Sequence, residues 1–176
     1  MIVSDATTLL ARTPHALTTL LDGLPEEWLH RDDGEGTWSA YAIAGHLLHG
    51  DATNWLPRIR LIVEHGTDRP FVPFNRVAML DWAPEPVSAL LDRFRSARSA
   101  SLREFGSLGL TQDDLTRSGT HPEFGTVTLE QVLAAWVAHD LTHLAQIGEV
   151  LAGRYREEVG PYRRYMPALE RTAPAE

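Results

Sequence analysis

The chain has 176 residues, 43% of them hydrophobic, which is enough for one globular domain and argues against a disordered segment. Its formal net charge of −8 at pH 7 repels phosphate backbones, so we expect no nucleic-acid partner. The chain has no cysteine, which excludes disulfides, zinc–thiolate centres and cysteine nucleophiles.

The sequence also carries no membrane or export signal. No apolar run approaches the roughly 18 residues of a membrane span. Residues 1–5 lack a basic stretch followed by an apolar core. We therefore expect a cytoplasmic protein without a membrane partner. We expect a single domain over residues 1–176, in which residues 167–176 form a flexible tail.

The first half of the chain predicts two long helices. Thr13 stands before a proline, which predicts a helix that Thr13 caps and that runs to about Leu21. Ser39 is the expected N-cap of a second helix. Pro57 should bend this helix rather than end it, because the apolar pattern continues to Gly66, the expected stop.

A long connection and a third helix follow. Residues 67–84 contain three prolines and three aromatic residues, which predict an ordered loop with a short helical turn within residues 75–80. From Pro86 onward, apolar residues recur at intervals of three and four. This pattern predicts a third amphipathic helix that ends near Gly106.

The last third of the chain predicts one more long helix. Residues 118–125 are expected to form a loop. Thr128 and Gln131 have the spacing of a capping box, which opens a helix running to about Glu158, where Gly160 and the next proline stop it. Strand signals are scarce, so four long helices predict an all-α four-helix bundle.

The most informative pair in the chain is His139 and His143 in this fourth helix. Residues four apart share one helix face, so both imidazoles could bind one metal ion if a third ligand is near. His46, in the second helix, is close to apolar positions and can face the same core. Spacing alone leaves surface or core histidines as the alternative. Asp140 points about 100° away from His139, and we expect it to support a ligand or lie on the surface rather than act as a base.

The chain resembles the DinB-like (damage-inducible) superfamily of metal-binding four-helix bundles. The residues that carry the resemblance are Trp38-Ser39, His46-Leu47-Leu48-His49, and the run from Thr128 to Ile147 with His139 and His143. The resemblance implies an up-down-down-up helix order with a long loop between helices 2 and 3. It also implies a homodimer, and a divalent metal ion, zinc or nickel, bound by His46, His139 and His143.

Five other histidines have less defined roles. His49 could be a fourth ligand, a side chain that supports the site, a proton carrier or a polar residue at the rim. His121 could overhang the site from the loop before the fourth helix. We expect the remaining three, His15, His30 and His65, to be solvated.

Three functions stay open at the level of the sequence. The resemblance favours a metal-dependent low-molecular-weight-thiol S-transferase that acts on small electrophiles. The first alternative is a metal-dependent hydrolase, which lacks a clear carboxylate base beside the histidines. The second is a stress protein that binds a metal or ligand without catalysis. The expected partner is a small-molecule substrate or a thiol cosubstrate.

Overall fold

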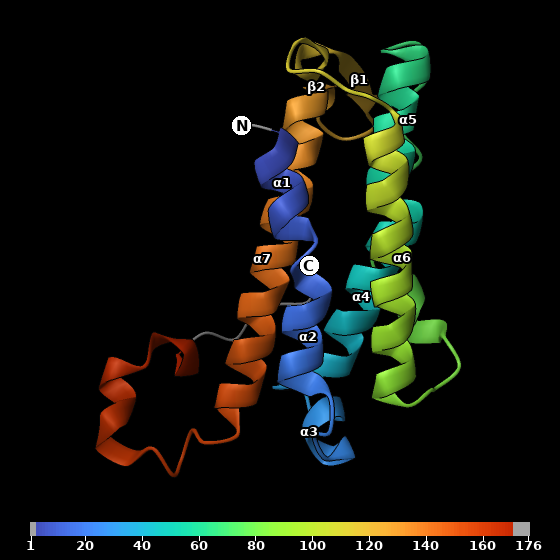
Figure 1. Cartoon of the computed structure of the whole chain (residues 1–176). Coiled ribbons are helices and arrows are strands. Elements are labelled where there is room, and N and C mark those ends of the chain that lie inside the picture. Colours follow the sequence, from blue (N-terminus) through green and yellow to red (C-terminus); the bar gives the residue numbers. More distant parts are fainter. Residues whose placement is uncertain (1–2, 171–176) are drawn as a thin grey trace.

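The computed structural model describes residues 3–170, and these form four helical rods with a small hairpin at one end (Figure 1). The first rod consists of α1 and α2, the second of α4 and α5, the third of α6 and the fourth of α7. The helices are α1 (Val3–Leu10), α2 (Thr13–Leu21), α3 (Glu26–His30), α4 (Ala40–Thr53), α5 (Trp55–His65), α6 (Val87–Ser107) and α7 (Leu129–Gly153). The strands are β1 (Ser118–His121) and β2 (Gly125–Thr128), and the short 3-10 helices are η1 (Ala78–Asp81), η2 (Asp113–Thr116), η3 (Gly160–Tyr165) and η4 (Pro167–Leu169).

The rods follow the expected up-down-down-up order. In Figure 1 the first rod runs away from the hairpin end, and α4 and α5 return toward it. The connection between His65 and Val87 then spans the length of the bundle, so that α6 runs parallel to the second rod and α7 antiparallel to it. The four-helix bundle and the long second connection are confirmed. None of the helices in the described part of the chain is long and apolar enough to cross a membrane.

Two predicted helix starts are confirmed in atomic detail. Ser39 Oγ accepts a hydrogen bond from the N–H of Ala42 at 3.2 Å. Thr128 and Gln131 exchange both hydrogen bonds of the capping box. The predicted cap at Thr13 is wrong. Thr13 is already helical, and its hydroxyl donates to the buried carboxylate of Asp140 at 2.6 Å, because a tertiary partner takes the place of the local N–H.

The predicted bend in the second rod is present, but it lies before the proline. Asn54 separates α4 from α5, with φ of −112° and ψ of −66°. Pro57 has no N–H to donate, and its ring conflicts with the carbonyl of Thr53, four residues earlier. The helix therefore breaks within the turn that precedes Pro57. Gly66 ends α5 as expected, with a φ of 57°.

The end of α7 differs from the prediction. The helix ends at Gly153, before the expected Glu158. Beyond it, the guanidinium of Arg154 lies 4.2 Å from the ring centroid of Trp28, and Tyr155 packs edge-on against the same ring. These contacts with α3 turn the chain away from the helix axis, and the sequence around Gly160 could not reveal them.

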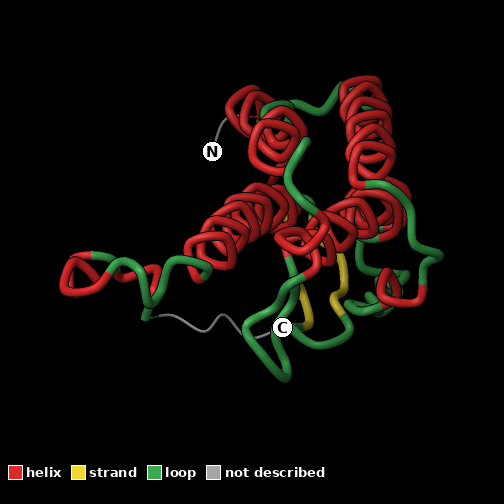
Figure 2. Tube along the Cα trace, turned by 90° about the horizontal axis from the view of Figure 1, so that it is seen from below, coloured by secondary structure: helices red, strands yellow, loops and turns green. Residues whose placement is uncertain are grey.

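The residues after α7 form an arm that projects from the bundle and folds back, so that η4 contacts α7 (Figure 2). Leu169 is only 3% exposed. Residues 167–169 of the predicted tail are thus a packed 3-10 turn rather than free chain. Residues 171–176 of that tail lie outside the described residues.

The predicted loop over residues 118–125 is instead part of a β-hairpin. Strands β1 and β2 pair antiparallel, with Ser118 opposite Thr128 and His121 opposite Gly125. Strands of four residues are too short to show an alternating pattern. Gly119 is required here, because a Cβ atom would lie 2.7 Å from Cγ1 of Ile62 and 2.8 Å from the ring of Phe71. The hairpin therefore packs directly on α5 and the long connection.

A buried polar layer separates two apolar clusters along the bundle, and each rod contributes one side chain to it. Arg98 of α6, 1% exposed, binds Asp51 of α4 through Nε at 2.9 Å and Asp140 of α7 through a second nitrogen at 2.6 Å. Thr13 of α2 donates to the same Asp140 carboxylate, and Arg98 also donates to the carbonyl of Leu10 at 2.7 Å. The guanidinium is therefore fully paired inside the core.

Candidate metal centre

The three predicted histidines meet beside this polar layer. His46 comes from α4, and His139 and His143 come from successive turns of α7. One ring nitrogen of each lies within 4.8 Å of the others, and Nε2 of His46 is 3.0 Å from Nε2 of His139. His46 and His143 are buried, whereas His139 is partly exposed toward a cavity. Facing helices thus bring together residues that are far apart in the sequence.

This donor set fits a divalent metal ion. Two imidazole nitrogens that bind one tetrahedral zinc ion, each at about 2.0–2.1 Å, are about 3.3 Å apart. The observed separation of 3.0 Å between the two Nε2 atoms is close to this spacing. Imidazole suits zinc and nickel alike, and three neutral imidazoles leave a coordination position open.

Hydrogen bonds orient two of the three rings. Nδ1 of His46 donates to the carbonyl of Arg76 at 2.9 Å, and Nδ1 of His143 donates to the amide oxygen of Gln146 at 2.7 Å. Because these oxygens only accept, each Nδ1 carries the proton and each Nε2 keeps its lone pair for a metal ion. Gln146 was not anticipated, although its place one turn after His143 is the signal that could have found it.

The third ring is held by packing. His139 lies edge-on to Trp55 with ring centroids 5.1 Å apart. Its Nδ1 is buried without a hydrogen-bond partner among residues 3–170. Gly50 makes room for this arrangement, since a Cβ atom there would lie 3.3 Å from Nε1 of Trp55 and 3.9 Å from Cε1 of His139.

Burial keeps two of these rings neutral. Desolvation, followed by the neighbouring His143, lowers the pKa of His46 to about 4. The same two causes, together with His46, lower the pKa of His139 to about 2. Both rings are therefore uncharged at pH 7, which is the form that binds a metal ion.

Acid should destabilise the metal-free protein between pH 6.5 and about 4. In this window the unfolded chain protonates His46, whose ordinary pKa is 6.5, while the folded protein, with its pKa of about 4, does not. The free energy of unfolding therefore has its full value above pH 6.5 and decreases as the pH falls to about 4. His46 alone accounts for on the order of 3 kcal/mol of this decrease. Urea unfolding of metal-free protein at several pH values measures the loss. His46→Gln should reduce the slope, and equal slopes in both proteins would contradict the prediction.

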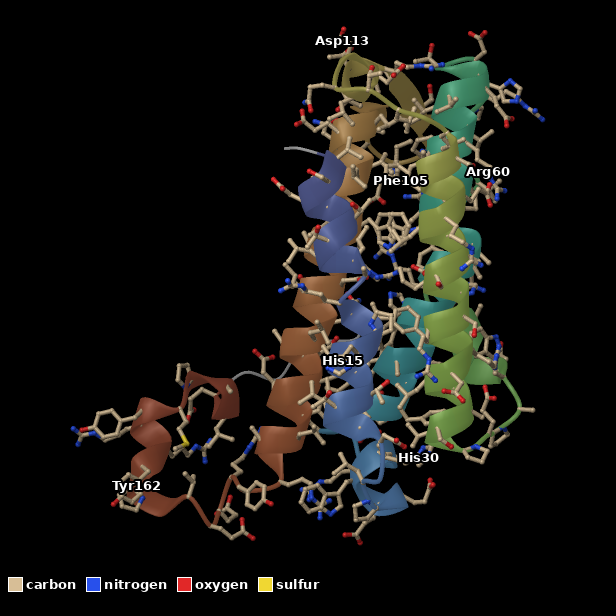
Figure 3. All side chains as sticks on the ribbon, in the orientation of Figure 1. His15, His30, Arg60, Phe105, Asp113 and Tyr162 are labelled. Carbon is tan, nitrogen blue, oxygen red and sulfur yellow. The ribbon has the colours of Figure 1, made fainter. Side chains whose placement is uncertain are left out.

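The other histidines lie outside the cluster. His49 points to the long connection, where its Nε2 donates to the carbonyl of Asn75 at 3.0 Å and its ring stacks on Phe74. It therefore holds the connection in place and is not a fourth member of the group. His15 and His30 lie on the outer surface, as expected (Figure 3).

The histidine cluster opens into a cavity of about 760 Å³. Its walls come from α4 and α5, the long connection, the hairpin and the part of α7 between Gln131 and His143. The predicted overhang of His121 is observed, because this residue of β1 lines the same cavity. The other lining residues are Trp38, Asn54, Trp55, Arg58, Pro73, Phe74, Arg76, Pro122, Glu123, Phe124, Val127, Gln131, Val132 and Ala135.

Asp140 belongs to the polar layer, which corrects both predicted placements, as a support for a metal ligand and as a surface residue. It is 2% exposed, and within residues 3–170 its carboxylate is hydrogen-bonded to Arg98 and Thr13 rather than to a histidine. The sequence could have indicated this partner. Arg98 lies four residues after Phe94 and seven after Leu91, on the apolar face of α6.

Comparison with known proteins agrees with this geometry. A family model described as the DinB superfamily matches residues 9–147, most of the chain and all three histidines of the cluster. The structure is similar to YfiT from Bacillus subtilis, described as a probable metal-dependent hydrolase with an unusual four-helix bundle topology. The TM-score is 0.73 at 20% identity, over 88% of this chain and 87% of that one, which establishes the fold. No curated protein matches the sequence.

Proposed function

Because the chain belongs to the DinB superfamily, we propose that it is a metal-dependent hydrolase of small molecules, with His46, His139 and His143 as the metal ligands. The observation that carries the proposal is the convergence of three imidazoles, at least two of them neutral at pH 7, at a cavity large enough for a small substrate. The similarity to YfiT supports the same choice. A bound divalent ion would supply Lewis acidity and make water nucleophilic near neutral pH.

Two residues of the hairpin region suit hydrolysis, one as a hydrogen-bond donor and one as a proton acceptor. Nδ1 of His121 accepts hydrogen bonds from the N–H groups of Glu123 and Phe124 at 3.1 and 3.3 Å. The neutral ring therefore carries its proton on Nε2, where it can donate a hydrogen bond to an oxygen of the substrate. Burial, followed by the charge of Arg58, lowers the pKa of His121, which keeps the ring neutral at pH 7.

Glu123 provides the carboxylate that the sequence did not reveal. It lines the same cavity as the histidines, and it reaches this wall because the hairpin folds over α5. A carboxylate there can accept a proton from an attacking nucleophile. Its counter-charge is Arg76, whose guanidinium nitrogen lies 4.0 Å from a Glu123 oxygen.

Metal-loaded protein should hydrolyse small esters, lactones or amides, and chelation should abolish the activity. Glu123→Gln should lower kcat by about 10²–10⁴-fold, because it removes the proton acceptor, while the metal content stays unchanged, because Glu123 is not one of the three proposed ligands. Glu157→Gln, exposed and outside the cavity, is the matched control and should leave kcat unchanged. The absence of metal-dependent hydrolysis across all three substrate classes would refute the proposal.

A metal-dependent thiol S-transferase is the second candidate. A cavity of about 760 Å³ can hold a small thiol and an electrophile together, and the thiol would come from the small molecule because the chain has no cysteine. Incubation with bacillithiol, mycothiol or glutathione and monochlorobimane tests it. Metal-dependent conjugation without hydrolysis would favour the transferase. A bound metal without either activity would favour the stress protein that binds without catalysis.

The metal and the assembly are further parts of the proposal. We propose zinc or nickel as the ion, since both suit imidazole donors. We also propose a homodimer. The C-terminal arm exposes four large side chains that a second copy could cover: Tyr155, Tyr162, Tyr165 and Met166, which are 43–68% exposed. Figure 3 shows Tyr162 at the far end of this arm.

A further inference from the structure

The charge of the cavity is opposite to that of the whole protein. The chain carries a formal net charge of −8, but the cavity is lined by two arginines, Arg58 and Arg76, and by one acidic residue, Glu123. In an acidic protein, small anions are attracted to such a positively charged cavity and not to the outer surface.

Arg58 has no carboxylate partner among residues 3–170. Its side chain is half-buried and packs over Phe71, with the guanidinium carbon 5.3 Å from the ring centroid. Its Nε is buried without a hydrogen-bond partner among the described residues. Burial and the charge of Arg76 both lower the pKa of Arg58, and no carboxylate counteracts them. A buried Nε without a partner is unfavourable, and a bound anion would remove this cost.

Arg76 is fixed next to the metal centre through its backbone. Its carbonyl accepts the hydrogen bond from Nδ1 of His46, so the residue cannot move away without disturbing that ring. Its side chain is 55% exposed, and its only carboxylate contact within residues 3–170, with Glu123, is as long as 4.0 Å. The guanidinium can therefore turn toward an anion in the cavity.

The rest of the wall suits an apolar body. Trp38, Trp55 and Phe74 line the cavity, and their rings pack beside His46 or His139. Among them, Asn54 is 5% exposed, and its Oδ1 has no hydrogen-bond partner in the described part of the chain. A ligand that fills this space can satisfy that amide while its apolar part contacts the rings.

We propose that the cavity binds a small, largely apolar organic anion, whose carboxylate or phosphate is held by Arg58 and Arg76 while its reactive part reaches the three histidines. The inference rests on the proposed function and names the substrate class for it. Guanidinium groups bind both kinds of oxyanion in the same bidentate way, so the chemistry common to both is an anionic oxygen group.

Ligand binding tests the proposal without any catalysis. Phenylacetate, phenyl phosphate and the neutral phenylacetamide are titrated into metal-free protein, with the fluorescence of Trp38 and Trp55 in the cavity wall as the readout. We expect at least one of the two anions to bind at least about tenfold more tightly than the amide. Arg58→Gln should remove this preference and leave amide binding unchanged. The anion that binds more tightly shows whether the site prefers a carboxylate or a phosphate.

Arg60→Gln is the matched control. Arg60 lies on the same helix as Arg58 and points outward to Glu104 (Figure 3). Its replacement by glutamine removes the same positive charge as Arg58→Gln. Three results would each overturn the proposal. The first is equal affinity for phenylacetamide and both anions, and the second is equal anion affinity in Arg58→Gln and Arg60→Gln. The third is the absence of saturable binding at millimolar ligand concentration. Failure of the hydrolase proposal looks different, because metal-free protein would still bind anions through Arg58. If the hydrolysis rate depends neither on Arg58→Gln nor on the charge of the substrate, the hydrolase proposal stands and the proposed anion site is wrong.

Discussion

Protein purified without a histidine tag should contain about one divalent ion per chain, and His139→Ala should contain almost none. Three imidazoles provide all the protein ligands of the proposed centre, so the loss of one leaves two donors. Even the loss of an outer hydrogen-bond partner typically weakens metal affinity 10–100-fold, and the loss of a ligand should cost more. Elemental analysis after dialysis against a weak chelator measures the metal content.

The controls separate ligands from histidines that are merely close. His49→Ala, on α4 but outside the cluster, should keep its ion, because His49 binds the backbone of the long connection. Circular dichroism should show that both variants remain helical. If the combined replacement of His46, His139 and His143 by alanine kept the full metal content, the metal centre would not be where we propose it.

Arg98→Met should destabilise the protein by about 3–5 kcal/mol, the usual cost of removing one member of a buried ion pair. Arg98 neutralises Asp51 and Asp140, and each of these three residues is at most 2% exposed. Burial already raises the pKa of Asp51, and the charge of Arg98 opposes this effect. Methionine fills a similar volume but leaves both carboxylates without a counter-charge. Urea unfolding of metal-free protein at pH 7 measures the difference.

Arg95→Met provides the matched control for this prediction. Arg95 lies one turn earlier on α6, is 61% exposed, and pairs with Asp92 on the surface. Its replacement should change stability by no more than about 0.5 kcal/mol. The polar layer would lose its assigned role if both variants unfolded at the same urea concentration. A combined Asp51→Asn and Asp140→Asn replacement on Arg98→Met should recover part of the loss, because no buried charge then remains.

Local signals predicted the helices well where both partners of an interaction are near in the sequence. The caps at Ser39 and Thr128 and the stop at Gly66 use atoms within four residues, and all three are confirmed. The signals failed where a distant residue decides the outcome. The hydroxyl of Thr13 donates a hydrogen bond to Asp140, and the end of α7 is determined by contacts with α3.

The site divides in the same way. The spacing of His139 and His143 on one helix face, with His46 and the resemblance to the DinB family, predicted the cluster that the bundle brings together. The cavity above it was not predicted. Arg58, Arg76 and Glu123 lie on a bent helix, a long connection and an unexpected hairpin, and each is an ordinary charged residue in its own segment.

The sequence by itself thus determined the four helices, their order through the family resemblance, and the face that carries the two histidines of α7. These depend on the 3.6-residue period and on caps, which act between near neighbours. Only the tertiary structure decided the buried pairing of Arg98 and the charge of the cavity. The burial and pairing of a charge depend on which distant side chains exclude water around it, and this is set only when the rods and the hairpin pack.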